Sequence, residues 1–211
     1  MIPTYEAWSA ALEERHGKEL QSKFSSAAVA VCGLGGLGSN IAIALARAGV
    51  GRLLLIDYDR VDITNLHRQQ YKANQVGMNK TDALKENLLE IAPYVTLETH
   101  SVRIAENNAE ALLEKADIIC EAFDDADCKA MLVNIVTERM PEKYLVAASG
   151  MAGMDSANTI QTRRISKRFY ICGDGTSDVS EAGSLVASRV MLCAAHQAHT
   201  VLRILTEQFE T

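Results

Sequence analysis

Three features that mark other classes of protein are missing from this 211-residue sequence. The cysteines, at positions 32, 120, 128, 172 and 193, form no Cys-x-x-Cys pair, which disfavours a disulfide scaffold and a structural zinc site. No apolar run is long enough to cross a bilayer. Basic residues are not in excess, because the formal net charge is -6. A general nucleic-acid or anionic-membrane surface is therefore not expected.

The start of the chain also lacks the pattern of a secretory signal. Residues 1–5 contain no basic segment followed by an apolar core. We therefore expect a cytoplasmic protein without a membrane partner. With 48% hydrophobic and 23% charged residues, the composition is that of an ordinary globular protein. A chain of this length buries a sizeable core, so we expect a single domain over residues 1–211.

Short apolar runs alternate with helical patterns along most of the chain. A leading helix is expected from Thr4 to about residue 24, outside this alternation. The alternation predicts an α/β fold, a Rossmann-like, doubly wound and mostly parallel sheet. The expected strands are residues 27–32, 53–56, 95–99, 117–120 and 144–148, and the expected helices are residues 39–48, 79–91, 107–115 and 126–139.

The last part of the chain has a different pattern. Residues 150–176 are rich in Gly, Ser and Thr, and contain short β-like runs that predict a small antiparallel extension. A long amphipathic helix over residues 184–209 closes the chain. The single domain is thus divided into a leading helix, an α/β core, and an extension with the closing helix, over residues 1–25, 26–149 and 150–211.

A glycine-rich turn follows the first strand and opens the first helix of the core. Its glycines leave room for a phosphate to approach backbone N–H groups at a helix N-terminus. Asp57 follows Gly33 by 24 residues and stands at the tip of the next strand, where a carboxylate can accept ribose hydroxyls. We interpret the turn as a nucleotide site, and tight helix packing without a ligand is the alternative. The glycines are Gly33, Gly35, Gly36 and Gly38.

Cationic and amide side chains follow in the next loop, which reads Asn-Leu-His-Arg-Gln-Gln over residues 65–70. Arg68 and the later Lys80 are candidates to neutralise phosphates whose charge rises during displacement. Simple dinucleotide binding does not explain such a set. The alternative for each residue, taken singly, is a solvated surface charge.

An acidic segment over residues 121–125 ends a later strand, at the edge where open α/β sheets bind ligands. Asp124 is a candidate for Mg²⁺, a hard cation that prefers one or two carboxylates with phosphate oxygens and water. The alternative is an N-cap for the helix that begins near residue 126, and Asp125 is the better candidate for that role.

Together these segments resemble the ThiF/MoeB family, the bacterial relatives of ubiquitin-activating enzymes, over nearly the whole chain. Segments 148–153 and 170–175 are similar to the short, zinc-free ThiF type. Five motifs carry the resemblance: the glycine run 33–38, Asp57-Tyr58-Asp59, Asn65-Leu66-x-Arg68-Gln69, Lys80, and Asp124 within residues 121–125.

The resemblance implies a homodimeric adenylyltransferase that uses ATP and Mg²⁺. The C-terminal glycine of a ubiquitin-like, ThiS-like sulfur-carrier protein with a Gly-Gly tail would attack the α-phosphate. The products would be an acyl-adenylate and pyrophosphate, and a sulfur donor protein would then act on the adenylate. The ThiF type further implies a role in thiamine thiazole biosynthesis.

The resemblance also implies roles for single residues. Asp57 would hold the ribose, with Asp59 beside it in the nucleotide-binding set, and Asp124 would hold magnesium. An arginine from the leading helix of the partner subunit reaches the phosphates in this family, and Arg15 is the best-placed candidate; otherwise Arg15 is an exposed helix charge. The expected phosphate-binding residues are Asn65, Arg68, Gln69 and Lys80.

Two departures from the family pattern limit the expected chemistry. Fuller members of the family carry two Cys-x-x-Cys pairs that bind structural zinc. This chain has only Cys172 near the position of the first pair, so zinc is not expected. Residues 179–183 read Val-Ser-Glu-Ala-Gly where some relatives have a cysteine that links to the carrier, so the reaction is expected to stop at the adenylate. Cys172 is a weak candidate nucleophile, because no His or Lys stands beside it in sequence.

Three other functions remain open. A tRNA-modifying dehydratase of the same superfamily would use the same adenylation on a tRNA-bound carboxylate, although the acidic composition counts against nucleic acid. A non-catalytic scaffold would bind the carrier without turnover, and the intact Arg68, Lys80 and Asp124 weigh against it. An NAD-dependent oxidoreductase would prefer NADH to Mg-ATP.

Overall fold

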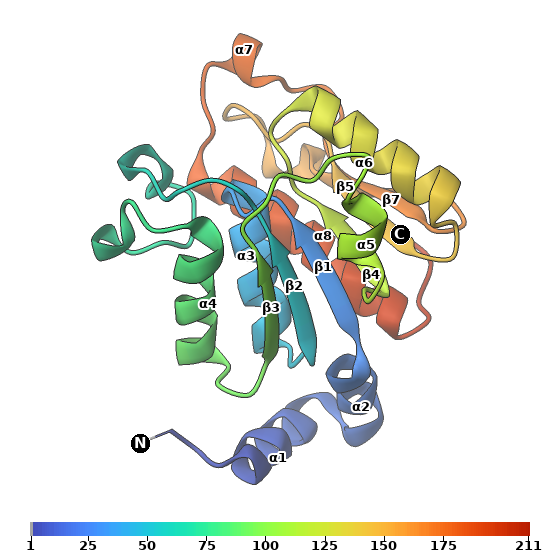
Figure 1. Cartoon of the computed structure of the whole chain (residues 1–211). Helices are drawn as coiled ribbons and strands as arrows, with labels where there is room; N and C mark the ends of the chain where they lie inside the picture. The colour runs from blue at the N-terminus through green and yellow to red at the C-terminus, as the bar shows by residue number, and fades with distance from the viewer. Residues whose placement is uncertain (1) are drawn as a thin grey trace.

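The computed structural model describes residues 2–211, so the Met1 end of the expected leading segment lies outside the described residues. Within these described residues, seven strands form one sheet in the order β3-β2-β1-β4-β5-β7-β6 (Figure 1). The strands are β1 Ala28–Cys32, β2 Arg52–Ile56, β3 Thr96–His100, β4 Ile118–Glu121, β5 Tyr144–Ala148, β6 Gln161–Ser166 and β7 Phe169–Gly173.

All neighbouring strands in this sheet are parallel except β6 and β7. The predicted Rossmann-like, mostly parallel α/β fold is therefore confirmed. The C-terminal extension differs from the expectation in one respect: β7 continues the parallel sheet beside β5, and β6 alone runs antiparallel. The helices are α1 Tyr5–His16, α2 Lys18–Ser26, α3 Gly36–Arg47, α4 Lys80–Ile91, α5 Ala109–Leu113, α6 Ala126–Arg139, α7 Val179–Ala182 and α8 Ala187–Leu205.

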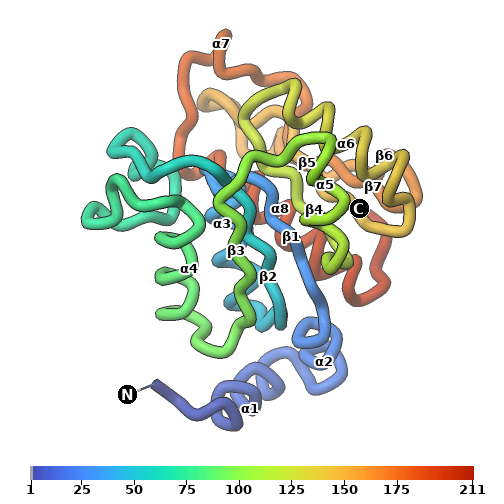
Figure 2. Tube along the Cα trace, in the orientation of Figure 1, coloured from blue at the N-terminus to red at the C-terminus, as the bar shows by residue number. Residues whose placement is uncertain are grey.

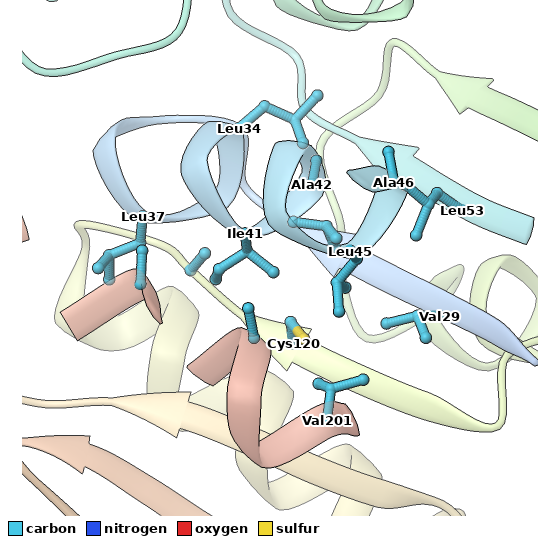
Figure 3. Packing of buried hydrophobic residues seen from close by; sticks show 14 of the residues in the cluster. Val29, Leu34, Leu37, Ile41, Ala42, Leu45, Ala46, Leu53, Cys120 and Val201 are labelled. Atoms are coloured by element: carbon cyan, nitrogen blue, oxygen red, sulfur yellow. The ribbon is translucent and has the colours of Figure 1, made fainter. Parts of the chain in front are cut away.

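Alternate residues of the central strands pack into two separate cores, one on each face of the sheet. Val29 and Val31 of β1 face α3, α4 and α8, whereas Ala30 and Cys32 face α5 and α6. Figure 3 shows Ile41 and other residues of α3 packed between the sheet and α8. Each fully buried aliphatic side chain of this size contributes about 1.5–3 kcal/mol to stability. The cores thus fix α3, and with it the turn that precedes α3, against β1.

The chain order reverses across β1, because β2 and β3 lie on one side of it and β4 and β5 on the other. The loops that follow β1 and β4 therefore leave the sheet in opposite directions. Ligands of open α/β sheets bind in the crevice that such a reversal creates at the carboxyl ends of the strands. The fold places the glycine-rich turn at this point.

The leading segment forms two helices, so the prediction of one helix is wrong. Gly17 adopts a positive φ of 86°, and its N–H donates to Glu13, which ends α1 before α2 begins. Both helices lie below the sheet, at the end opposite α7 (Figure 1). The Gly51 N–H donates to the Phe24 carbonyl at 3.0 Å, which fixes α2 at the amino-terminal ends of β1 and β2.

Two further helices differ from the expectation in their bounds. Helix α8 begins at Ala187, after the separate short helix α7, because Gly183 with φ 67° ends α7. Helix α5 covers only Ala109–Leu113. The chain between β2 and α4 loops out beside the sheet (Figure 2), with single 3-10 turns at Ile63–Asn65 and Ala73–Gln75. Within residues 2–211, no helix combines the length and apolar character needed to cross a membrane.

Candidate nucleotide-binding site

Internal packing explains three of the four glycines in the turn after β1. A Cβ on Gly33 would lie 2.8 Å from the Ala122 carbonyl oxygen, and Gly33 also has a φ of 88°. A Cβ on Gly38 would lie 1.8 Å from the Gly33 oxygen, and one on Gly36 would lie 2.9 Å from Val190. Gly35 has no such constraint, because its Cβ would meet only Gln69 at 3.7 Å. Close approach of a ligand is a reason for glycine at position 35 that packing does not supply.

Asp57 is buried at the tip of β2 and binds the glycine turn directly. Its Oδ2 accepts a hydrogen bond from the Leu34 N–H at 2.6 Å, and its Oδ1 accepts one from the Asp59 N–H at 2.8 Å. Each carboxylate oxygen has a second lone pair available for a further donor. Asp57 therefore shapes the turn and still offers acceptors at the position expected for a ribose.

Lys80 lies beside the same aspartates, in the first turn of α4. Its side chain is only 8% exposed, with Nζ 2.7 Å from Asp59 Oδ2 and 4.0 Å from Asp57 Oδ2. The surface-charge interpretation is therefore wrong for Lys80. Two carboxylates face one ammonium group here, so Lys80 compensates buried negative charge as well as bordering the proposed phosphate path.

The loop that carries Arg68 is held against α3 by side-chain hydrogen bonds. Asn40 donates to the Arg68 carbonyl at 3.2 Å, and Gln70 donates to Asn40 Oδ1 at 2.7 Å. The stem of Arg68 passes over the start of α3, since a Cβ on Gly36 would lie 3.5 Å from Arg68 Cγ. The guanidinium donates to the Thr64 carbonyl at 3.2 Å and forms no ion pair with any described carboxylate of residues 2–211. A cation without a carboxylate partner thus stands at the turn.

The two other predicted residues of this loop have different surroundings. Gln69 is buried, and its Oε1 has no hydrogen-bond partner in the described chain, while its amide nitrogen is the neighbour of Gly35. Asn65 uses its Oδ1 to accept the Asp62 N–H at 3.0 Å in a local capping box. Gln69 therefore faces the turn, whereas the side-chain oxygen of Asn65 stabilises the loop itself.

Asp124 and Asp125 have separate roles at the end of β4. Asp125 caps α6, because its Oδ1 accepts the Cys128 N–H at 2.8 Å, and this hydrogen bond lowers the pKa of Asp125 below its ordinary value. Asp124 is exposed. No cluster of three or more His, Cys, Asp or Glu side chains that would hold a metal occurs in the part of the chain that is described. Asp124 is thus a hard oxygen ligand that fits Mg²⁺ only with phosphate oxygens and water completing the shell.

An ion pair that none of the sequence motifs indicates lies under this edge of the sheet. Glu121, 1% exposed, faces Lys129 Nζ at 2.9 Å and also accepts the Phe123 N–H at 2.7 Å. Burial raises the pKa of Glu121, and the nearby Lys129 ammonium opposes that rise. Lys129 therefore compensates a buried carboxylate. No local spacing rule signals this pair, because it joins a strand end to the following helix.

Two other candidates lie away from the turn. Arg15 is exposed on α1, at the opposite end of the sheet, so a role for it at this site requires a second subunit. Cys172 is buried, with Thr162 and Thr200 beside its Sγ, and burial raises the pKa of its thiol. A buried, protonated thiol is a poor nucleophile, so the nucleophile interpretation of Cys172 is not supported.

Comparisons with known proteins agree with this geometry. A family model described as the ThiF family matches residues 9–211. The chain is 38% identical over 136 residues to adenylyltransferase and sulfurtransferase MOCS3 of Culex quinquefasciatus, covering 64% of this chain and 31% of that protein. It is 27% identical over 192 residues to adenylyltransferase and sulfurtransferase UBA4 of Lodderomyces elongisporus, covering 88% and 42%. The chain thus spans less than half the length of these two relatives.

The fold also has a solved counterpart. The crystal structure of the E. coli tRNA N6-threonylcarbamoyladenosine dehydratase TcdA in complex with ATP superposes with a TM-score of 0.86, covering 98% of each chain. Sequence identity in that superposition is 22%. The likeness therefore shows that the two chains share a fold.

Proposed function

This chain belongs to the ThiF family, and we propose that it is an ATP-dependent adenylyltransferase acting on the C-terminal glycine of a ubiquitin-like sulfur-carrier protein. The observation that carries the proposal is the placement of Arg68 over Gly36, without a carboxylate partner among the described residues. A cation at the glycine turn suits a polyphosphate whose charge develops during displacement. The adenylyltransferase relatives and the ATP complex of the E. coli dehydratase support ATP as the nucleotide.

In the proposed reaction, ATP lies with its phosphates on the turn after β1 and its ribose at Asp57. An oxygen of the carrier's terminal carboxylate forms a bond to the α-phosphorus, while the bond from that phosphorus to the bridging oxygen of pyrophosphate breaks. Arg68 and the N-terminus of α3 stabilise the charge on the phosphates. Magnesium held at Asp124 would neutralise further phosphate charge when bound.

The remaining family features are proposals of the same kind. The whole chain acts as one adenylating domain, pairs as a homodimer in the cytoplasm, and receives Arg15 of the partner subunit at each site. The activated carrier passes to a sulfur donor protein, in the thiazole branch of thiamine synthesis. A dimer accounts for the position of Arg15, which its own subunit keeps far from the turn.

A second candidate is adenylation of a tRNA-bound carboxylate, favoured by the superposition with the E. coli dehydratase over 98% of each chain. Exchange of labelled pyrophosphate into ATP separates the two, using Gly-Gly-tailed carriers in one arm and tRNA in the other. Carrier-dependent exchange that is lost in Arg68→Ala but kept in Arg47→Ala supports the first candidate. Exchange that requires tRNA supports the second. ATP binding without exchange in either arm supports a scaffold.

Arg47 provides a matched control for Arg68. It is exposed in the last turn of α3, whereas Arg68 covers the first turn of the same helix. Both variants lose one arginine, but only Arg68→Ala removes a cation from the turn.

A further inference from the structure

Arg103 joins two walls of the site that no motif connects. It lies in the loop after β3, and its guanidinium carbon is 5.7 Å from the centroid of the Tyr58 ring. Its Nη2 donates to Cys128 Sγ at 3.5 Å. Tyr58 directly follows Asp57 after β2, and Cys128 lies in the first turn of α6 after β4. Arg103 therefore bridges the elements on either side of the glycine turn.

The loop that carries Arg103 is fixed in place. Asn108 donates from its amide to the Arg103 carbonyl at 3.0 Å, and its Oδ1 accepts the Ala105 N–H at 2.8 Å. The Arg103 side chain is exposed and makes no ion pair with a carboxylate within residues 2–211. A flat cation is thus held at the carboxyl edge of the sheet without a charge partner.

Contacts of the glycine turn connect it to the ends of the two strands whose following segments Arg103 bridges. Asp57 Oδ2 contacts the Leu34 N–H, and Phe123 lies 3.0 Å from where a Cβ of Gly33 would stand. The tips of β2 and β4 therefore both touch the turn. With the phosphates on the turn and the ribose at Asp57, as the proposed function has them, the base would extend between these tips, toward Arg103 and its contacts Tyr58 and Cys128.

We propose that the purine ring of the nucleotide stacks on the Arg103 guanidinium, which the Tyr58 ring supports from its other face. This inference rests on the proposed function for the nucleotide and adds the residue that recognises its base. A guanidinium is planar and can stack face to face on a ring, whereas a lysine ammonium is a compact point charge without such a plane. Tyr58 is 59% exposed, so its ring is a surface platform and not a core residue.

The test measures binding of Mg-ATP and of Mg-tripolyphosphate, which lacks the base and ribose, to the intact protein by calorimetry. Arg103→Ala is expected to weaken ATP binding on the order of tenfold, as loss of one base stack does, and to leave tripolyphosphate binding unchanged. Arg103→Lys keeps the charge and is expected to resemble Arg103→Ala. Arg68→Ala is expected to weaken the binding of both ligands, and Arg47→Ala is expected to change the binding of neither.

A second readout uses the thiol that Arg103 touches. Of the five cysteines, Cys128 alone is not buried, so N-ethylmaleimide should label it first in the folded protein. ATP is expected to slow this labelling, whereas tripolyphosphate is expected to leave its rate unchanged. The variant Cys128→Ser is the control, because it removes the thiol that is labelled.

The stacking role would be overturned if Arg103→Ala weakened the binding of ATP and of tripolyphosphate equally. It would also be overturned if Arg103→Lys bound ATP as tightly as the unmodified protein. Failure of the unmodified protein to bind ATP would overturn the proposed function as well, whereas ATP binding without exchange would leave the stacking result to stand alone.

Discussion

The Leu34 N–H donates a 2.6 Å hydrogen bond to Asp57 Oδ2, so the acidic tip of β2 and the glycine turn after β1 form one structural unit. The motif spacing places the acid near the turn for a ribose, and the structure adds that the acid also orients the turn. Lys80 joins the same unit through Asp59 and Asp57. Replacing one member should therefore change both stability and ligand binding.

Asp57→Ala leaves the Leu34 N–H without its buried acceptor. Loss of a charge-assisted hydrogen bond of this kind is expected to cost about 1.5–3 kcal/mol in the free energy of unfolding. Urea denaturation followed by circular dichroism measures the change. Asp57→Asn keeps one acceptor oxygen and should lose less. Equal stability of Asp57→Ala and the unmodified protein would show that the contact does not hold the turn.

Arg189 and Asp174 form a buried ion pair, 2.6 Å apart, that organises the segment after β5. Arg189 also donates to the carbonyls of Ala152, Asp155 and Ser156. Burial opposes the Asp174 charge, but hydrogen bonds from Ser177, Thr176 and Arg189 outweigh it and hold the pKa of Asp174 well below its ordinary value.

A carboxyl group with a lowered pKa in the folded state stabilises the fold above its unfolded pKa of about 3.9, and this stability is lost as the pH falls below that value. Asp174→Asn is therefore expected to lower the free energy of unfolding by about 3 kcal/mol at pH 7. Between pH 4 and pH 2, the Asp174→Asn variant should also lose less of its free energy of unfolding than the unmodified protein does. Urea unfolding across this range, with exposed Asp155→Asn as the control, measures both effects.

Lys129→Met leaves the buried Glu121 carboxylate without its ammonium partner and is expected to cost about 3–5 kcal/mol. A carboxyl group with a raised pKa in the folded state stabilises the fold at low pH and loses that contribution as the pH rises through the folded pKa. The destabilisation should therefore grow from pH 4 to pH 8. The double variant Lys129→Met with Glu121→Gln should recover much of the loss, and no recovery would argue against charge compensation.

Arg68→Ala is expected to lower the rate of adenylation about 100-fold, because removal of one group that stabilises transition-state charge has effects of this order. The melting temperature should stay close to that of the unmodified protein, since Arg68 makes no ion pair in the described chain. Single-turnover kinetics with saturating ATP isolates the chemical step. A change confined to the ATP affinity would assign Arg68 to binding alone.

The sequence predicted the parts of this molecule that depend on local pattern. Alternation of apolar runs and helical stretches indicated the parallel sheet, and the run from Gly33 to Gly38 marked the turn at its reversal point. Asp125 was identified as the cap of α6 from its position alone. In each case the physical cause lies within a few residues of the feature.

Contacts between segments that are distant in the sequence could not be predicted from local patterns. Glu121 pairs with Lys129, Asp174 with Arg189, and Arg103 with Tyr58 only after the chain has folded. The parallel pairing of β7 with β5 likewise depends on the path of the whole segment after residue 150. The predicted single helix ran across Gly17, whereas this glycine adopts a positive φ of 86° that separates α1 from α2.

The central claim is that the carrier's terminal glycine is adenylated. Intact-mass spectrometry of a Gly-Gly-tailed carrier, incubated with the protein, Mg-ATP and pyrophosphatase, tests it directly. The expected result is an AMP adduct on the carrier that disappears with Arg68→Ala and with a carrier lacking its last glycine, and that persists with Arg47→Ala. ATP cleavage to AMP and pyrophosphate that requires tRNA, with the carrier left unmodified, would contradict it.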